Sequence, residues 1–286
     1  MRSRSSASRS GATRINRRAF LKLSAAVGAA SLTPAPRLSI ASTLPLPFPH
    51  QFFPHAESLL TLRLTAFNLL LIPAYAAADL IRRSALHIIP GQPGRAHDPE
   101  GAFTIPYTRA VGALIYQGAP PTSLDDLWTR DALWPDAPRL VIGAALLRRG
   151  YSLNDTHPGH LAQAEEDLLR LGPRLVRDPV AGLRSGLTSL ALAAVSARIA
   201  AAEPGGVFFL PEGAALIEYD WAIPLDAPHP EAALSFVTAM AHAPRFIAKH
   251  PCGTLHAPRL TPLTPLPAAA LAQRAGIWAR LKEITA

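Results

Sequence analysis

Three groups of residues in the sequence could carry out chemistry, and none has the spacing that catalysis requires. Cys252 is the single cysteine; no recognisable His-rich pattern surrounds it, so we expect a bystander thiol and no internal disulfide. His157 and His160 could bind a metal ion, but without an evident third ligand we expect a loop pair at a helix start. The stretch 182–186, Gly-Leu-Arg-Ser-Gly, does not have the spacing of a nucleophile elbow.

Other catalytic and cofactor motifs are also missing from the sequence. It contains no phosphate loop, no dinucleotide fingerprint and no His-Glu-x-x-His motif. We therefore predict a protein that is not an enzyme and that carries no cofactor and no metal. A hydrolase is kept as a remote alternative.

The positive charge of the chain is concentrated at its N-terminus. Residues 1–37 contain eight of the 28 Lys and Arg residues and none of the 20 Asp and Glu residues, so the remainder is formally neutral. A basic face for nucleic acid is therefore not expected. Arginines followed by a short apolar core, residues 19–32, are typical of an export signal, and this core is too short for a membrane anchor.

The order of residues in this leader resembles the twin-arginine signal, which directs folded proteins to the twin-arginine translocase. The residues that carry the resemblance are Arg17, Arg18, Phe20, Leu21 and Lys22. We expect residues 1–37 to be the signal, with cleavage after Ala30, Ala35 or Ala41, and a periplasmic mature protein. The alternative is a basic N-terminal helix that remains attached.

The remaining residues have the pattern of an α/β protein with one large or two small domains. An apolar run at 67–72 predicts a buried strand, and a helix is expected to start after Pro73. Residues 112–117 and 206–210 also have strand-like patterns. Residues 158–171 predict a helix, with Pro158 in its first turn and an apolar stripe formed by Leu161, Ala164, Leu168 and Leu171.

Five blocks of sequence, in order, resemble the spermidine/putrescine-type solute-binding proteins of ABC transporters. They are residues 67–86, 103–116, 121–128 (Pro-Thr-Ser-Leu-Asp-Asp-Leu-Trp), 143–161 and 212–237. The resemblance implies a two-lobe periplasmic-binding-protein fold of type II. Lobe one would consist of residues 38–106 plus 220–286 and lobe two of residues 107–219, joined by crossing segments at 107–116 and 219–224. The first lobe is expected to be truncated, because the residues before Phe67 can supply about one strand and one helix.

The resemblance further implies a monomer that binds a small molecule, a polyamine or another amine, in the cleft between its lobes and delivers it to a membrane permease. Five residues are the candidates for ligand binding. Tyr75, Tyr107 and Tyr219 could stack on the ligand, and Asp136 and Asp220 could anchor an amine. Tyrosines that pack between domains and solvated aspartates are the alternative interpretation of the same residues.

Several positions at which this family has a serine, an aromatic or an acidic side chain carry other residues here. They are Ala74, Ala76, Ala137, Leu140, Ala194 and Ile217. Losing two carboxylate and two aromatic partners would weaken polyamine binding by about 7 kcal/mol. Tight polyamine binding through the usual contacts is therefore not expected. An altered ligand, a degenerate relative without a ligand and a partner-binding scaffold all stay open.

Overall fold

The structure is a computed structural model that describes residues 37–43, 46, 49–53, 56, 64–89, 91–195, 205–242 and 259–285. The chain divides into two units, Met1–Arg37 and Leu38–Ala286, and the second is described below. The proposed export signal, with Arg17, Arg18, Phe20, Leu21 and Lys22, lies outside the described residues, as does Cys252. Within the described part, no helix combines the length and the apolar character needed to cross a bilayer.

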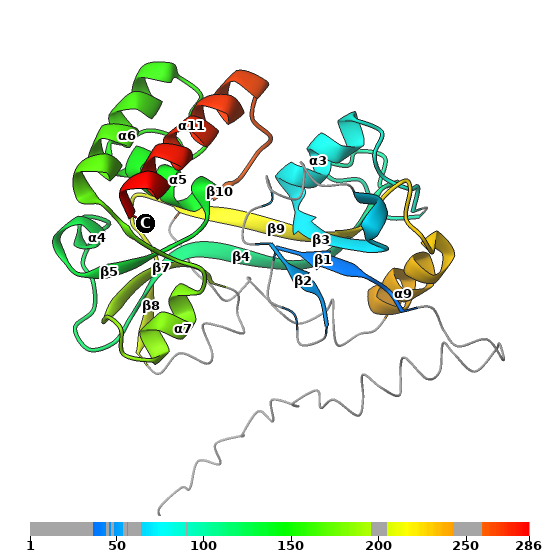
Figure 1. Cartoon of the computed structure of the whole chain (residues 1–286), viewed down its shortest axis with the longest axis horizontal. Helices are drawn as coiled ribbons and strands as arrows, with labels where there is room; N and C mark the ends of the chain where they lie inside the picture. The colour runs from blue at the N-terminus through cyan, green and yellow to red at the C-terminus, as the bar shows by residue number, and fades with distance from the viewer. Residues whose placement is uncertain are drawn as a thin grey trace, which may run out of the picture. The chain divides into compact units, whose positions relative to one another are not determined.

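Ten strands within the described residues form a mixed β-sheet at the centre of this unit (Figure 1), so the expected α/β class is confirmed. One half of the strand order, called the first side below, consists of three parallel strands: β2 (Gln51–Phe52), β1 (Ile40–Ser42) and β3 (Leu69–Pro73). Two long antiparallel strands follow, β9 (Ala214–Ala222) and β4 (Thr104–Tyr116). The second side holds β7 (Leu190–Val195), β5 (Ala132–Pro135) and β6 (Arg174–Val176). β8 (Gly206–Phe208) pairs with β4, and β10 (Leu260–Pro262) pairs with β9.

Helices pack against both halves of this sheet. A 3-10 turn, η1 (Leu64–Ala66), precedes β3, and α3 (Ala74–Arg82) follows it. The second side carries α4 (Asp126–Thr129), α5 (Pro138–Arg148), α6 (Pro158–Leu171) and α7 (Pro179–Arg184). α9 (Pro230–His242) follows β9, and α11 (Ala268–Thr285) contacts α6 and α5. Figure 1 shows α11 beside these two helices, near one end of the two long strands, and α3 near the other end.

The ends of α6 follow from its sequence. Pro158 stands in the first turn, where its missing N–H costs no hydrogen bond. Leu161, Ala164 and Leu168 are buried, as the apolar stripe predicted, whereas Leu171 is half-buried. The helix ends at Gly172, whose φ of 60° lies in the left-handed region that favours glycine. His157 is the residue before the first turn, so the predicted histidine pair does lie at a helix start.

Each side of the sheet has a hydrophobic core of its own. On the first side, Leu70 and Ile72 of β3 pack with Ala77 and Leu80 of α3. On the second, Leu133 of β5 belongs to a cluster built from β4, β5, β7 and α7. In the described part of the chain before β3, two short strands are present, β1 and β2, where the sequence predicted about one.

β4 and β9 pair with each other and extend from one side of the sheet to the other. Their register runs from Thr104 opposite Ala222 to Val111 opposite Leu216, with an irregularity between Pro106 and Thr108. The segments predicted to cross, 107–116 and 219–224, thus lie within or directly after these two neighbouring strands.

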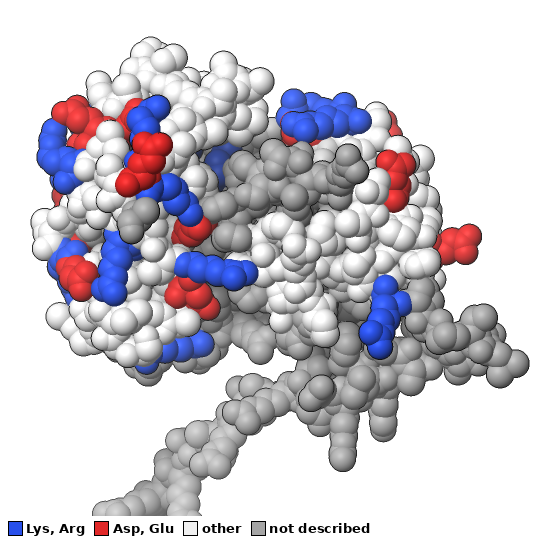
Figure 2. Space-filling view, in the orientation of Figure 1, with Lys and Arg blue, Asp and Glu red and all other residues white. Residues whose placement is uncertain are grey.

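Charged side chains of both signs lie close together on the second side. Figure 2 shows basic and acidic residues interspersed over the half of the molecule that carries α4, α6 and α11. Arg170 and Glu166 on α6 form one such exposed pair, with 2.6 Å between Nη2 and Oε1. Exposed pairs of this kind contribute little to stability.

Candidate functional site

A cavity of about 440 Å³ lies between the two sides of the sheet. Its walls come from the regions of β1 and β2, from the β3–α3, β5–α5 and β6–α7 junctions, and from β7 and β9. Three of these walls are places where a strand ends and a helix begins, and open α/β sheets bind their ligands at such carboxyl ends of strands. The volume is within the range of small-molecule sites.

The β3–α3 junction has no loop. β3 is the buried run Leu-Leu-Leu-Ile-Pro, and α3 starts directly after Pro73, whose φ of −62° and ψ of 146° are extended. Tyr75 is therefore in the first turn of α3 and lines the cavity. The proline cannot donate a hydrogen bond within the sheet, and it fixes the point at which the chain turns.

The β5–α5 junction supplies a buried arginine. Arg139 is in the first turn of α5 and has 3% of its surface exposed. Its Nη2 donates hydrogen bonds to Asn154 Oδ1 (2.9 Å) and to the Thr264 carbonyl (3.0 Å). Its Cζ lies 4.8 Å from the centroid of the Tyr75 ring. This cation–π contact joins α5 to α3 across the cavity.

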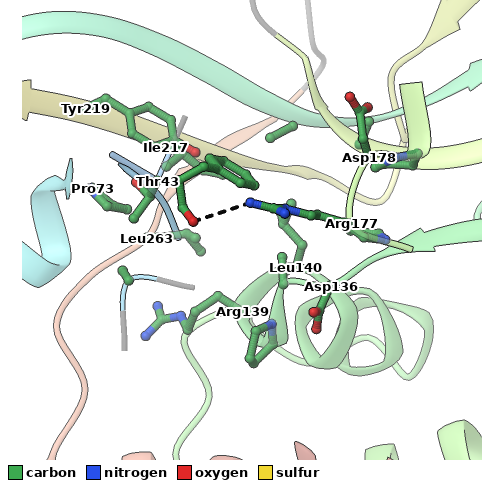
Figure 3. Close-up of a pocket in the computed structure, with 18 of the residues that line it drawn as sticks. Thr43, Pro73, Asp136, Arg139, Leu140, Arg177, Asp178, Ile217, Tyr219 and Leu263 are labelled. Atoms are coloured by element: carbon green, nitrogen blue, oxygen red, sulfur yellow. Dashed lines mark hydrogen bonds between the residues drawn. The ribbon is translucent and has the colours of Figure 1, made fainter. Parts of the chain in front are cut away.

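The β6–α7 junction supplies a second arginine that reaches across in the same way. Arg177 Nη2 lies 3.4 Å from the Phe52 carbonyl oxygen (dashed in Figure 3), and Arg177 Cζ lies 4.8 Å from the Phe52 ring centroid. Phe52 belongs to β2, on the opposite side of the sheet. Two arginines of the second side thus lie over two aromatic rings of the first.

The two carboxylates that line the cavity already have partners within the chain. Asp136 Oδ1 is 2.6 Å from Lys282 Nζ of α11. Asp178 is the N-cap of α7, where its Oδ1 accepts a hydrogen bond from the Ala181 N–H at 2.9 Å. Figure 3 shows Asp136 and Asp178 at different parts of the cavity wall.

Tyr219 comes from β9 and also lines the cavity (Figure 3). Only 5% of its surface is exposed. Burial raises the pKa of the Tyr219 phenol well above its usual value, so the group is neutral and can donate a hydrogen bond. Its hydroxyl makes no hydrogen bond to any residue that the structure describes.

Of the five ligand-binding candidates from the sequence, the structure brings three to this cavity: Tyr75, Asp136 and Tyr219. Positions at which the family has aromatic or acidic groups line it as well, namely Ala137, Leu140, Ala194 and Ile217. On α3 the family's ligand-binding positions match Ala74 and Ala76, but neither of them lines the cavity. Tyr75, between them, does.

The other two candidates, Asp220 and Tyr107, are not among the cavity-lining residues. Asp220 is 1% exposed, and its carboxylate lies 2.6 Å from Arg95 Nη1 and 2.6 Å from His97 Nε2. Successive side chains of a strand point to opposite faces of the sheet, so Tyr219 and Asp220 cannot both face the cavity. Tyr107 lies at the irregularity of β4, with its ring centroid 5.3 Å from that of Trp221.

Sequence reasoning missed Arg139, Arg177 and Phe52. Arg139 lies three residues after Asp136, in a stretch where the family resemblance indicated only acidic ligand-binding groups. Arg177 directly precedes an Asp-Pro pair, a signal for a helix start that could have marked the junction. No local pattern distinguishes Phe52, because its role depends on Arg177, which is far away in the sequence.

No family model and no curated protein matches this sequence. Solved structures do match. A putative spermidine/putrescine ABC transporter protein from Listeria monocytogenes is 16% identical with a TM-score of 0.70, over 86% of this chain and 98% of that one. A periplasmic thiamin-binding protein is 15% identical with a TM-score of 0.61, over 90% and 100%. The binding protein MotA of A. tumefaciens, solved with glucopine, is 11% identical with a TM-score of 0.64, over 87% and 99%.

The three neighbours are associated with different small molecules, namely spermidine or putrescine, thiamin and glucopine. They are binding proteins and transporter components, and none of the three is described as an enzyme. The matches extend over most of both chains in each comparison. The chain therefore has the α/β fold of type II periplasmic binding proteins.

Proposed function

We propose that this protein is the exported solute-binding component of an ABC transporter of the polyamine-type family, and that it binds a small molecule without making or breaking a bond. The cavity of about 440 Å³, bordered by the carboxyl ends of strands from both sides of the sheet, carries the proposal. The fold shared with transporter binding proteins supports it.

In this proposal β4 and β9 are the hinge between two lobes. They are the long strands that extend into both sides of the sheet, and opening would need only small changes along them. Lobe one would hold residues 38–106 and the chain after 220 except its last helix, and lobe two residues 107–219. The last helix would belong with lobe two, because α11 contacts α5 and α6.

The proposed site consists of Tyr75, Asp136 and Tyr219 together with the arginines Arg139 and Arg177. The arginine–aromatic pairs between α5 and α3 and between Arg177 and Phe52 would close the cavity around the ligand. The partners of the protein would be the twin-arginine translocase during export to the periplasm and the membrane permease afterwards. The protein would act as a monomer.

A thermal-shift screen of the full exported protein, purified from the periplasm, tests this function. The panel contains polyamines, amino acids, sugars and organic acids, each at a concentration that reveals weak binding. A ligand present at one hundred times its dissociation constant stabilises the native state by about 2.7 kcal/mol. We expect a clear shift with at least one class of compound. No response to any class would contradict ligand binding and favour a partner-binding scaffold.

A further inference from the structure

The charges of the cavity point away from amine ligands. An amine needs a carboxylate to replace its hydration, yet Asp136 pairs with Lys282 and Asp178 caps α7. Asp220 is buried against Arg95 and His97. Each of these carboxylates thus has a cation or an N–H of this chain as its partner.

The donor groups of the cavity are in the opposite situation. Arg177 pairs with no carboxylate among the described residues, and its one hydrogen bond there, from Nη2 to the Phe52 carbonyl, is 3.4 Å long. A guanidinium has five N–H donors, so several of its donors are left for a ligand. Arg177 is exposed at the wall of the cavity, where an entering molecule can reach it.

The hydroxyl of Tyr219 provides a second and independent observation. The side chain is 95% buried at the cavity wall, and within the described ranges no acceptor or donor is bonded to its hydroxyl. The hydroxyl oxygen borders the open space of the cavity, where it has no hydrogen-bond partner among the described residues. An oxygen atom of a ligand in the cavity would supply this partner.

A smaller cavity of about 210 Å³ adjoins the larger one. It is lined by Asp136, Arg177 and Lys282, among others, and shares Asp136 and Arg177 with the larger cavity. Two cations therefore surround one carboxylate at the place where the cavities meet. The rest of the larger cavity is mainly apolar, with Pro73, Leu140, Ala194, Ile217 and Leu263 in its walls.

We propose that the cavity binds a small organic oxyanion, a carboxylate or a phosphate attached to an apolar body, with Arg177 as its charged partner and the Tyr219 hydroxyl as a hydrogen-bond donor. This inference rests on the proposed solute-binding function and specifies its ligand class. The apolar walls contact the body of the ligand. The oxyanion accepts hydrogen bonds from the donors that have no acceptor in the described part of this chain.

Isothermal titration of the full exported protein tests the proposal with six probes. The anionic probes are benzoate, succinate, glycerol 3-phosphate and inorganic phosphate; spermidine and putrescine are the cationic probes. We expect binding of at least one organic anion and weaker or no binding of both amines. The comparison of carboxylates with phosphates identifies the oxyanion, and inorganic phosphate shows whether the apolar body is needed.

Two variants and two matched controls identify the residues involved. Arg177→Gln should weaken binding of the anion about tenfold or more, because it removes a hydrogen bond to a charged group. Tyr219→Phe should weaken it severalfold without lowering the melting temperature of the free protein, because no internal hydrogen bond is lost. Arg174→Gln, three residues before Arg177 and outside both cavities, and Tyr151→Phe, outside them as well, should leave affinity unchanged.

The two proposals fail in different ways. If spermidine or putrescine binds more tightly than every anion, or if Arg177→Gln leaves anion affinity unchanged, the oxyanion inference is wrong while solute binding stands. If a neutral compound of the wider thermal-shift screen binds and no anion does, the oxyanion inference is likewise wrong and solute binding stands. If no compound of any class binds, the proposed function itself is contradicted.

Discussion

Arg177 of the β6–α7 junction lies over the ring of Phe52 on β2, with 4.8 Å between Cζ and the ring centroid and 3.4 Å between Nη2 and the Phe52 carbonyl oxygen. The two residues lie on opposite sides of the sheet and are 125 positions apart in the sequence. The contact therefore joins the two sides directly at the cavity. Any opening of the cavity along this wall must break it.

Replacing the ring tests how much this contact contributes. In Phe52→Leu the side chain stays apolar but the cation–π attraction is lost, so we expect the free energy of unfolding to fall by about 0.5–1 kcal/mol. Urea denaturation without ligand measures the change. Phe52→Tyr keeps an aromatic face and serves as the control, with stability close to that of the parent protein. Equal losses in both variants would show that packing, and not the cation, is responsible.

Filling the cavity should abolish binding without unfolding the protein. Ala194 on β7 lines the cavity and is half-buried, so Ala194→Phe would place a ring in the empty space. We expect loss of the thermal shift by the best ligand of the screen, with a melting temperature within a few degrees of the parent protein. Ala194→Ser is the size-matched control and should retain binding. Full binding by the Phe variant would place the ligand elsewhere.

Local signals in the sequence were sufficient for the β3–α3 unit. An apolar run followed by proline predicted a strand at 67–72 and a helix after Pro73, and the structure has β3 at Leu69–Pro73 and α3 at Ala74–Arg82. The residue pattern predicted only the end of β4, at 112–117, and the family resemblance added a crossing segment at 107–116, whereas the strand begins at Thr104. Much of β4 is buried in a row from Ala110 to Ile115, so it lacks the alternation that marks a half-exposed strand.

The candidate site could be predicted only in part, for a related reason. Tyr75, Asp136 and Tyr219 became candidates through the family resemblance, and of their strands only the one before Tyr75 was predicted from a local apolar pattern. The partners of Asp220 lie in the loop before β4, about 125 positions earlier. Whether a carboxylate binds a ligand or an arginine depends on residues that are far apart in the sequence. Local hydrophobic patterns do not predict such pairs.

Asp220 should matter for stability and not for binding. Asp220→Asn would leave Arg95 and His97 facing a neutral group in a buried position, so we expect the free energy of unfolding to fall by about 3 kcal/mol. Ligand affinity, measured at a temperature where the variant is folded, should be unchanged. Glu218→Gln, two residues earlier on β9 and paired with the exposed Arg109, is the control and should cost less than about 1 kcal/mol. A large loss of affinity in Asp220→Asn would mean that Asp220 does contribute to ligand binding.

Export should depend on the two adjacent arginines of the leader. Changing both Arg17 and Arg18 to Lys keeps the charge of the leader but removes the guanidinium pair of the proposed twin-arginine signal. We expect the variant to accumulate inside the cell, as measured by fractionation and immunoblotting. Arg9→Lys together with Arg14→Lys, outside the motif, should export normally. Normal export of the Arg17 and Arg18 variant would exclude the twin-arginine route.

The Asp167–Arg149 pair between α6 and α5 should make stability depend on acid. Arg149 Nε and Nη2 donate to the two carboxylate oxygens of Asp167 at 2.7 and 2.8 Å. These hydrogen bonds from Arg149 outweigh the effect of burial and hold the pKa of Asp167 below its usual value. A lowered native pKa means that the pair stabilises the fold above the unfolded pKa of about 4, and that this contribution is lost as the pH falls through the native pKa.

Asp167→Asn should therefore be less stable than the parent protein at pH 7 by about 1.5–3 kcal/mol, the contribution of hydrogen bonds to a charged group. The difference should stay constant between pH 7 and pH 5 and shrink below pH 4, because the parent protein then loses the same charge. Urea denaturation at pH 7, 5 and 3 measures this. Glu166→Gln, whose partner Arg170 is exposed, should differ by less than about 0.5 kcal/mol at pH 7. A difference for Asp167→Asn that persists unchanged at pH 3 would mean that shape, and not charge, is what α6 and α5 require at this position.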